Sequence, residues 1–149
     1  MATIPLPQEW REFLRLMISN DVRYMLVGGI AVGYYGYPRA TGDIDLWVDN
    51  SPENAKAVAK VLTEFGIEIS ESFYSVFGIR GKVFRLGRPP LRIEILTGIT
   101  GADFGDCYPR REQVQFDDLT LDIIHLADLK VNKRASGRTN DIDDLANLP

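Results

Sequence analysis

The segment 43–48 is the feature that most limits how this chain can fold. Its side chains form two alternating sets, with apolar Ile44, Leu46 and Val48 placed between Asp43, Asp45 and Trp47. Because successive side chains of a strand point to opposite faces, this alternation predicts a β-strand. Asp43 and Asp45 then point the same way, with their Cα atoms roughly 7 Å apart. The chain therefore contains a strand that holds two carboxylates close together.

Hydrophobic spacing, together with capping and turn residues, predicts the remaining elements. We expect helices at residues 8–19, 30–35, 52–65 and 125–137, and a last short helix after Asn140. We expect further strands at residues 24–27, 67–70, 81–87, 91–96, 113–116 and 119–124. A short turn joins 81–87 to 91–96, so these two strands are expected to be antiparallel. The fold class is α/β, of the α+β kind, with a mixed β-sheet flanked by helices.

Composition limits the class of protein. No repeat or linker divides residues 1–149, which are expected to form a single domain. A net charge of −4 argues against broad, charge-driven adhesion to nucleic acid or anionic lipid, although a local basic site remains open. The single cysteine, Cys107, the lack of a secretory signal and the lack of a membrane-length apolar run predict a cytoplasmic protein with no membrane partner.

A third carboxylate and a pair of glycines sharpen the interpretation of the acidic strand. Glu94 alternates with apolar neighbours in the strand 91–96, and Gly28-Gly29 follows the apolar strand 24–27. Adjacent glycines at a helix start let backbone N–H groups approach a phosphate. If the two acidic strands are neighbours, their carboxylates could hold divalent cations for phosphoryl transfer. The alternative is that Asp43 and Asp45 are solvated residues on an exposed sheet face.

Four stretches resemble the DNA polymerase β-like nucleotidyltransferase superfamily, and within it the small bacterial proteins related to AbiEii-type toxins of abortive-infection systems. Val27-Gly28-Gly29-Ile30-Ala31 and Arg39-Ala40-Thr41-Gly42-Asp43-Ile44-Asp45-Leu46 are similar to its Gly-Gly and Asp-x-Asp signature. Ile93-Glu94-Ile95-Leu96 is similar to its third-carboxylate strand, and residues 127–141 resemble its C-terminal Lys, Gly-Arg and Asp signature. The resemblance implies a nucleotidyltransferase fold.

The resemblance also implies roles for individual residues. Gly28 and Gly29 would contact the triphosphate of an NTP, and Asp43 and Asp45 would hold Mg²⁺, or Mn²⁺ in its place. Glu94 would complete the metal site and activate the acceptor hydroxyl. The superfamily often has serine at the position of Gly29 and commonly aspartate at that of Glu94. The longer side chain of Glu94 leaves sites with one and with two metals open.

Other cationic and hydroxyl side chains are candidates for the same site. Lys130 and Lys133 are three apart on a predicted helix, so together they could meet a triphosphate, although exposed lysines also occur without any such role. Arg39 and Thr41 alternate in register with Asp43 and are candidate contacts to phosphate and to metal-bound water. Arg39 is alternatively a turn residue.

The C-terminal region favours a structural interpretation for its remaining charges. Arg138, Asp141 and Asp144 are predicted to form a buried ion-pair cluster that docks the last helix. His125 is predicted to cap the helix that follows it or to pack beneath that helix, because no serine or cysteine nucleophile motif surrounds it.

Our functional hypothesis is Mg²⁺-dependent transfer of a nucleoside monophosphate from an NTP to a hydroxyl of RNA, protein or a small molecule, in a toxin–antitoxin or phage-defence system. Because the chain is short, a homodimer, a partner protein or a shallow groove would have to grip the acceptor. The alternative is a catalytically inactive nucleotide-binding or toxin-neutralising module. A sugar transferase using its Asp-x-Asp would lack the Gly-Gly helix, and a dinucleotide fold would need Gly-x-Gly-x-x-Gly.

Overall fold

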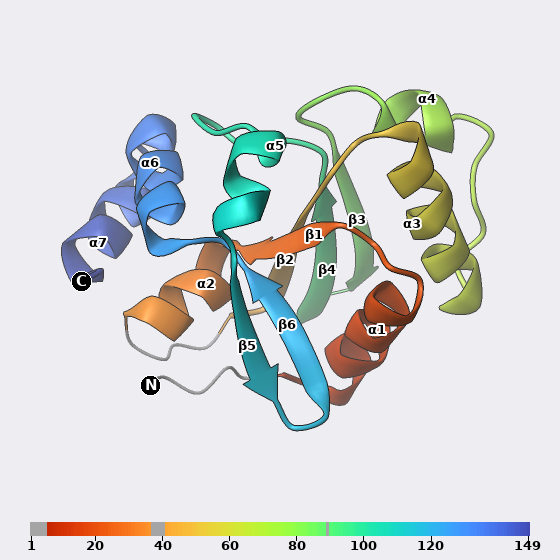
Figure 1. Cartoon of the computed structure of the whole chain (residues 1–149), viewed down its shortest axis with the longest axis horizontal. Helices are drawn as coiled ribbons and strands as arrows, with labels where there is room; N and C mark the ends of the chain where they lie inside the picture. The colour runs from red at the N-terminus through yellow and green to blue at the C-terminus, as the bar shows by residue number, and fades with distance from the viewer. Residues whose placement is uncertain (1–5, 37–40, 89) are drawn as a thin grey trace.

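A mixed, six-stranded β-sheet forms the centre of the protein (Figure 1). The computed structural model describes residues 6–36, 41–88 and 90–149. The strands are β1 (Tyr24–Val27), β2 (Asp43–Val48), β3 (Val83–Arg88), β4 (Leu91–Leu96), β5 (Glu112–Phe116) and β6 (Leu119–Ile123). Their order is β3-β4-β2-β1-β6-β5, with β2 parallel to β4 and β1 parallel to β6. The predicted mixed sheet and the antiparallel β3–β4 pair are confirmed.

Helices flank the sheet. They are α1 (Gln8–Ser19), α2 (Gly28–Tyr35), α3 (Pro52–Glu64), α4 (Phe73–Phe77), α5 (Phe104–Cys107), α6 (Leu126–Ser136) and α7 (Thr139–Asn147), with a 3₁₀ turn at Tyr108–Arg110. In Figure 1, α1, α3 and α4 gather at one side, and α2, α5, α6 and α7 gather at the other. The predicted helices are confirmed, and α2 begins two residues earlier than expected, at Gly28. Cys107 is buried.

The sequence predictions were wrong at residues 67–70, which form no strand. The N–H of Ile67 donates to the carbonyl of Leu62 at 2.8 Å, which continues the end of α3. Ile67 and Ile69 pack against the core while remaining partly exposed, so a loop satisfies the period-two pattern. The following α4 was not predicted, nor was α5. Each is a single turn of helix, too short to produce a recognisable hydrophobic period.

Local capping fixes where the longer helices begin and end. Ser51 Oγ accepts a hydrogen bond from the Asn54 N–H at 3.3 Å, at the start of α3. His125 Nδ1 accepts one from the Ala127 N–H at 3.0 Å and so caps α6, as predicted. Gly137 ends α6 in the left-handed conformation, with φ +62°. These caps fix the start of α6 and the point at which the chain turns into α7.

The two faces of β2 have different surroundings, and this difference positions the site. Ile44, Leu46 and Val48 are buried, which confirms the apolar face. On the other face Trp47 packs edge-to-face against Phe104 of α5, with ring centroids 5.3 Å apart. Asp43 and Asp45, earlier on the same face, are only partly buried. The acidic face is therefore closed at one end and open at the other.

Candidate active site

The parallel register of β2 and β4 brings the predicted carboxylates together. Asp45 lies opposite Glu94, and Asp43 lies opposite Arg92. Because residues paired across neighbouring strands point to the same face, these four side chains share one side of the sheet. The hypothesis of three carboxylates required β2 and β4 to be neighbours, and they are.

Asp45 is the electrostatic centre of this group. Burial raises the pKa of Asp45, the negative charges of Glu94 and Asp43 raise it further, and the result is a pKa of about 7. The more distant positive charge of Lys133 acts in the opposite direction. The ionised form of Asp45 is thus poorly solvated and repelled by its neighbours. Such a carboxylate favours a bound proton or a bound cation.

Arginines accompany the other two carboxylates. Arg92 Nε lies 2.9 Å from Asp43 Oδ1, and Arg85 Nε of β3 lies 3.5 Å from Glu94 Oε1. Both guanidinium groups reach solvent, with Arg85 exposed to 61% and Arg92 to 38%. Asp45 has no ion-pair partner in the described part of the chain. Repulsion at Asp45 is therefore relieved less than at its neighbours.

Carboxylate oxygens are ligands that Mg²⁺ and Mn²⁺ accept, so the donor set fits a hard divalent cation. Across the described ranges, however, no three His, Cys, Asp or Glu side chains are gathered as one metal-binding group. Arg92 and Arg85 would therefore compete with a cation for one oxygen each of Asp43 and Glu94. The raised pKa of Asp45 favours the cation electrostatically.

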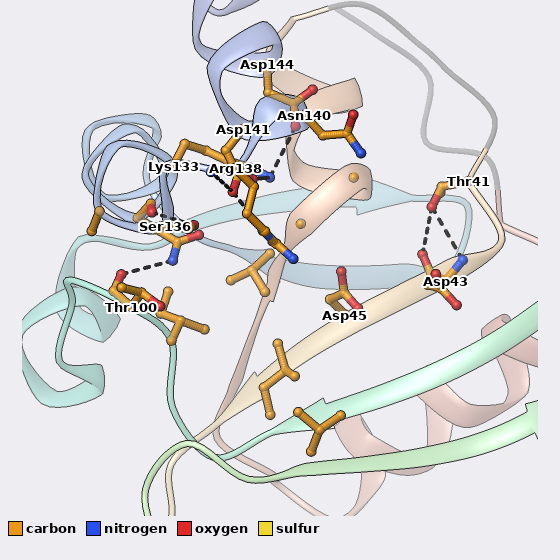
Figure 2. Close-up of a pocket in the computed structure, with 18 residues that line it drawn as sticks. Thr41, Asp43, Asp45, Thr100, Lys133, Ser136, Arg138, Asn140, Asp141 and Asp144 are labelled. Carbon is orange, nitrogen blue, oxygen red and sulfur yellow. Dashed lines mark hydrogen bonds and ion pairs between the residues drawn. The ribbon is translucent and has the colours of Figure 1, made fainter.

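A pocket of about 720 Å³ opens beside Asp45 (Figure 2). This volume suits a ligand of nucleotide size. Of the predicted site residues, the pocket is lined by Gly28, Gly29, Thr41, Asp43, Asp45 and Lys133. Glu94 and Lys130 are not among the described residues that line it. Arg39 lies outside the described residues.

Gly28 fits a position that no other residue could take without strain. Its φ is +67°, in the left-handed region, and an added Cβ would lie 2.1 Å from Asp45 Oδ2. Gly28 is also the first residue of α2, so it brings the start of that helix directly against the carboxylate. The structure thus gives Gly28 a packing role against Asp45, and phosphate contact by Gly28 and Gly29 stays a prediction.

Replacing Gly28 with alanine should displace the Asp45 carboxyl. We expect a loss of about 2–3 kcal/mol of unfolding free energy, from the positive φ and the clash together. Gly66→Ala is the matched control, because Gly66 also has a positive φ, +93°, but nothing within 4 Å of an added Cβ. Urea unfolding of both variants measures the difference. Equal losses would contradict a specific contact between Gly28 and Asp45.

The predicted buried ion-pair cluster is confirmed for Asp141 and Asp144, but Arg138 is 77% exposed and the buried cation is Lys133. Lys133 Nζ lies 3.0 Å from Asp141 Oδ1 and 3.1 Å from Asp144 Oδ2, and all three side chains are at least nine-tenths buried. Arg138 Nε lies 2.9 Å from Asp141 Oδ2. Burial raises the pKa of Asp141, but hydrogen bonds from Arg138 and Lys133 outweigh burial and hold it at about 2. The cluster joins α6 to α7.

The two lysines predicted to act together diverge. Lys133 reaches into the pocket, whereas Lys130 Nζ donates to the backbone carbonyl of Pro149. Thr41 Oγ1 donates to the carbonyl of Asp43 at 3.0 Å and so supports the entry to β2. Contacts of these side chains with phosphate stay predictions.

Sequence reasoning missed several polar residues of the site. Arg92 is two residues before Glu94 on the same strand, so strand alternation alone could have placed it on the acidic face. The position of Arg85 depends on the β3–β4 register, and Ser136 and Asn140 enter the pocket only because α6 and α7 pack there. Figure 2 shows Arg138, the residue before α7, extending toward Asp45.

Comparisons with known proteins support the fold. No protein-family model and no curated protein matches the sequence. The structure is similar to the crystal structure of a "putative nucleotidyltransferase" from Thermotoga maritima, with a TM-score of 0.60 and 15% sequence identity. The similarity covers 91% of this chain and 87% of that chain. At this identity it shows that the chain has a nucleotidyltransferase-like fold. Among the described residues, no helix is long and apolar enough to cross a membrane.

Proposed function

We propose that this protein transfers a nucleoside monophosphate from an NTP to a hydroxyl group and releases pyrophosphate. The observation that carries the proposal is a nucleotide-sized pocket lined by Asp43 and Asp45, with Glu94 opposite Asp45 on the neighbouring strand, in a nucleotidyltransferase-like fold. Asp43 and Asp45, with Glu94, would hold Mg²⁺ or Mn²⁺. When bound, the cation would supply charge stabilisation for the phosphates.

The chain's own residues suggest how the reaction would proceed. Glu94 would take the proton of the acceptor hydroxyl, while the acceptor oxygen forms a bond to the α-phosphorus. The bond from that phosphorus to the bridging oxygen breaks, and pyrophosphate leaves with the electron pair. Backbone N–H groups of Gly28 and Gly29 would bind phosphate oxygens. Arg138, which is 77% exposed and lines the pocket, would balance phosphate charge.

A catalytically inactive, nucleotide-binding or toxin-neutralising module of the same fold is the second candidate. The ion pairs Arg92–Asp43 and Arg85–Glu94 favour it, because they neutralise two of the three carboxylates without a metal. The setting in a toxin–antitoxin or phage-defence system remains a prediction from the sequence resemblance. So does the need for a homodimer or a partner protein.

Thermal unfolding with each of the four NTPs, with and without Mg²⁺ or Mn²⁺, tests the nucleotide site. At 100 times the dissociation constant we expect stabilisation of about 2.7 kcal/mol, which requires nucleotide and metal together. For this chain length that is a rise in melting temperature of roughly 5–10 °C. Asp43→Asn/Asp45→Asn should abolish the rise. Pyrophosphate release then separates the two candidates, since the inactive module would bind nucleotide without releasing any.

A further inference from the structure

One segment of this acidic protein is entirely cationic in its charges. Residues 72–93 contain Arg80, Lys82, Arg85, Arg88 and Arg92, and no aspartate or glutamate. The whole chain carries −4, so the other residues together carry −9. We call residues 72–93 the basic segment. Such separation of charge creates a local positive field that the net charge conceals.

The basic segment lies at the edge of the sheet. It comprises α4, a loop, the edge strand β3 and the start of β4. Lys82 directly precedes β3 and Arg88 is its last residue; both are exposed, and neither forms an ion pair within the described residues. A strand of this length spans about 17–20 Å, so the two cations could contact phosphates of several successive nucleotides.

Exposed apolar side chains accompany these charges. Tyr74, Ile79 and Val83 are 52%, 50% and 40% exposed, and they are three of the six large hydrophobic side chains exposed in the described residues. The exposed ring of Tyr74, on the helix that precedes β3, offers a nucleobase a stacking surface. Charges on the edge strand β3 could alternatively serve to prevent its pairing with a strand of another molecule. That role would explain the lysine and arginines, but it would not require an exposed tyrosine on the preceding helix.

The basic segment is continuous with the carboxylate site. Val83, at the start of β3, lines the pocket. Arg85 and Arg92 pair with Glu94 and Asp43, so the inner arginines of the segment contact the proposed catalytic residues. Lys82 and Arg88 alternate with Arg85 and lie toward the opposite side of the edge strand, where Phe84 packs on α4. A polyanion held by these two cations would therefore pass over the edge of the sheet to reach Arg85 and the carboxylates. Figure 2 shows β2, with Asp43 and Asp45, beside the neighbouring strands at the floor of the pocket.

We infer that the basic segment binds single-stranded RNA and thereby selects RNA as the acceptor of the proposed reaction. The role of RNA as acceptor rests on the proposed function, whereas the binding of RNA to the basic segment does not depend on it. A single strand suits the surface because its bases are free to stack and its end can enter the pocket. Thr41, Asn132 and Ser136 line that pocket with groups able to hydrogen-bond a ribose 2′-hydroxyl, which DNA lacks.

Fluorescence anisotropy with a labelled, unstructured RNA oligonucleotide tests the inference, with no NTP or metal present. The test variant is Lys82→Gln/Arg88→Gln, and the control is Lys56→Gln/Lys60→Gln. The control removes the same charge from exposed positions of α3. We expect the test variant to bind RNA roughly tenfold more weakly than the wild type. The slope of log K against log salt concentration should become shallower by about 1.4, and the control should bind like the wild type. Tyr74→Ala should weaken binding by a further fivefold or more.

Three results would overturn the inference: no RNA binding by the wild type, equal loss in the test and control variants, or equal affinity for DNA of the same sequence. Stabilisation by NTP and metal is measured on the same variants. If it persists while RNA fails to bind, the RNA surface is wrong and the nucleotide site stands. If RNA binds but NTP does not stabilise the protein, the proposed function fails instead. Self-association of Lys82→Gln/Arg88→Gln, with RNA binding intact, would assign the charges to protection of the sheet edge.

Discussion

Asp45→Asn should abolish pyrophosphate release and, at pH 8, make the protein more stable than the wild type. Asparagine keeps the shape of the side chain but cannot carry the negative charge that a bound cation needs, so turnover should fall by at least about a thousandfold. The gain in stability arises because asparagine removes the charge that Glu94 and Asp43 repel. If Asp45 acts as the proposed function requires, its replacement should lower activity and raise stability together.

The pH dependence of the gain follows from the raised pKa of Asp45. The folded state binds the proton of Asp45 more tightly than the unfolded state, since its pKa rises from 3.8 to about 7. The stability from this proton is complete below about pH 4 and is lost as the pH rises through about 7. Asparagine has no proton to lose. The advantage of Asp45→Asn should therefore grow between pH 4 and pH 8, to on the order of 2 kcal/mol.

Thermal melts from pH 4 to pH 8, without divalent metal, measure this gain. Asp143→Asn is the matched control, because Asp143 is exposed on α7 and its side chain has no hydrogen bond or ion pair in the described residues. The control should track the wild type at every pH. A melting temperature of Asp45→Asn well below that of the wild type at pH 8 would contradict the prediction, and Asp45 would then be structural.

The strands that carry the carboxylates could be predicted because their pattern is local. Alternation in segments 43–48 and 91–96 sets which side chains share a face of each strand, whatever the rest of the chain does. The register that places Asp45 opposite Glu94 is different, because it joins residues far apart in sequence. This register depends on how the whole sheet assembles. From the sequence one could say only that the carboxylates would meet if the two strands were neighbours.

The arginines and lysines illustrate the same limit. Arg85 meets Glu94 through the register of the β3–β4 hairpin, and Lys133 meets Asp144 through the packing of α6 on α7. A helical pattern gave Lys130 and Lys133 one common face, but helical spacing does not say which of the two a neighbouring helix will cover. Residues 67–70 show the converse, since a period-two pattern appeared where no neighbouring strand was available.

Lys133→Met should cost about 3–5 kcal/mol of unfolding free energy at pH 7. Methionine has a similar length, so the chain would keep its packing while Asp141 and Asp144 lost their shared cation. Removing one member of a buried ion pair is costly because the remaining charge stays desolvated. Arg138 still compensates Asp141 in part, which keeps the expected loss within this range. Urea unfolding measures it.

Lys130→Met is the matched control, one turn earlier on the same helix, and it should cost less than about 0.5 kcal/mol. The loss in Lys133→Met should shrink as the pH falls from about 4 toward about 2, because the low pKa of Asp141 stabilises the wild type only while that carboxyl is ionised. The same pair of variants decides what Lys133 does. If Lys133→Met remained as stable as the control but lost its stabilisation by NTP and metal, then Lys133 would be a phosphate ligand, and the cluster would not be what holds α7 on α6.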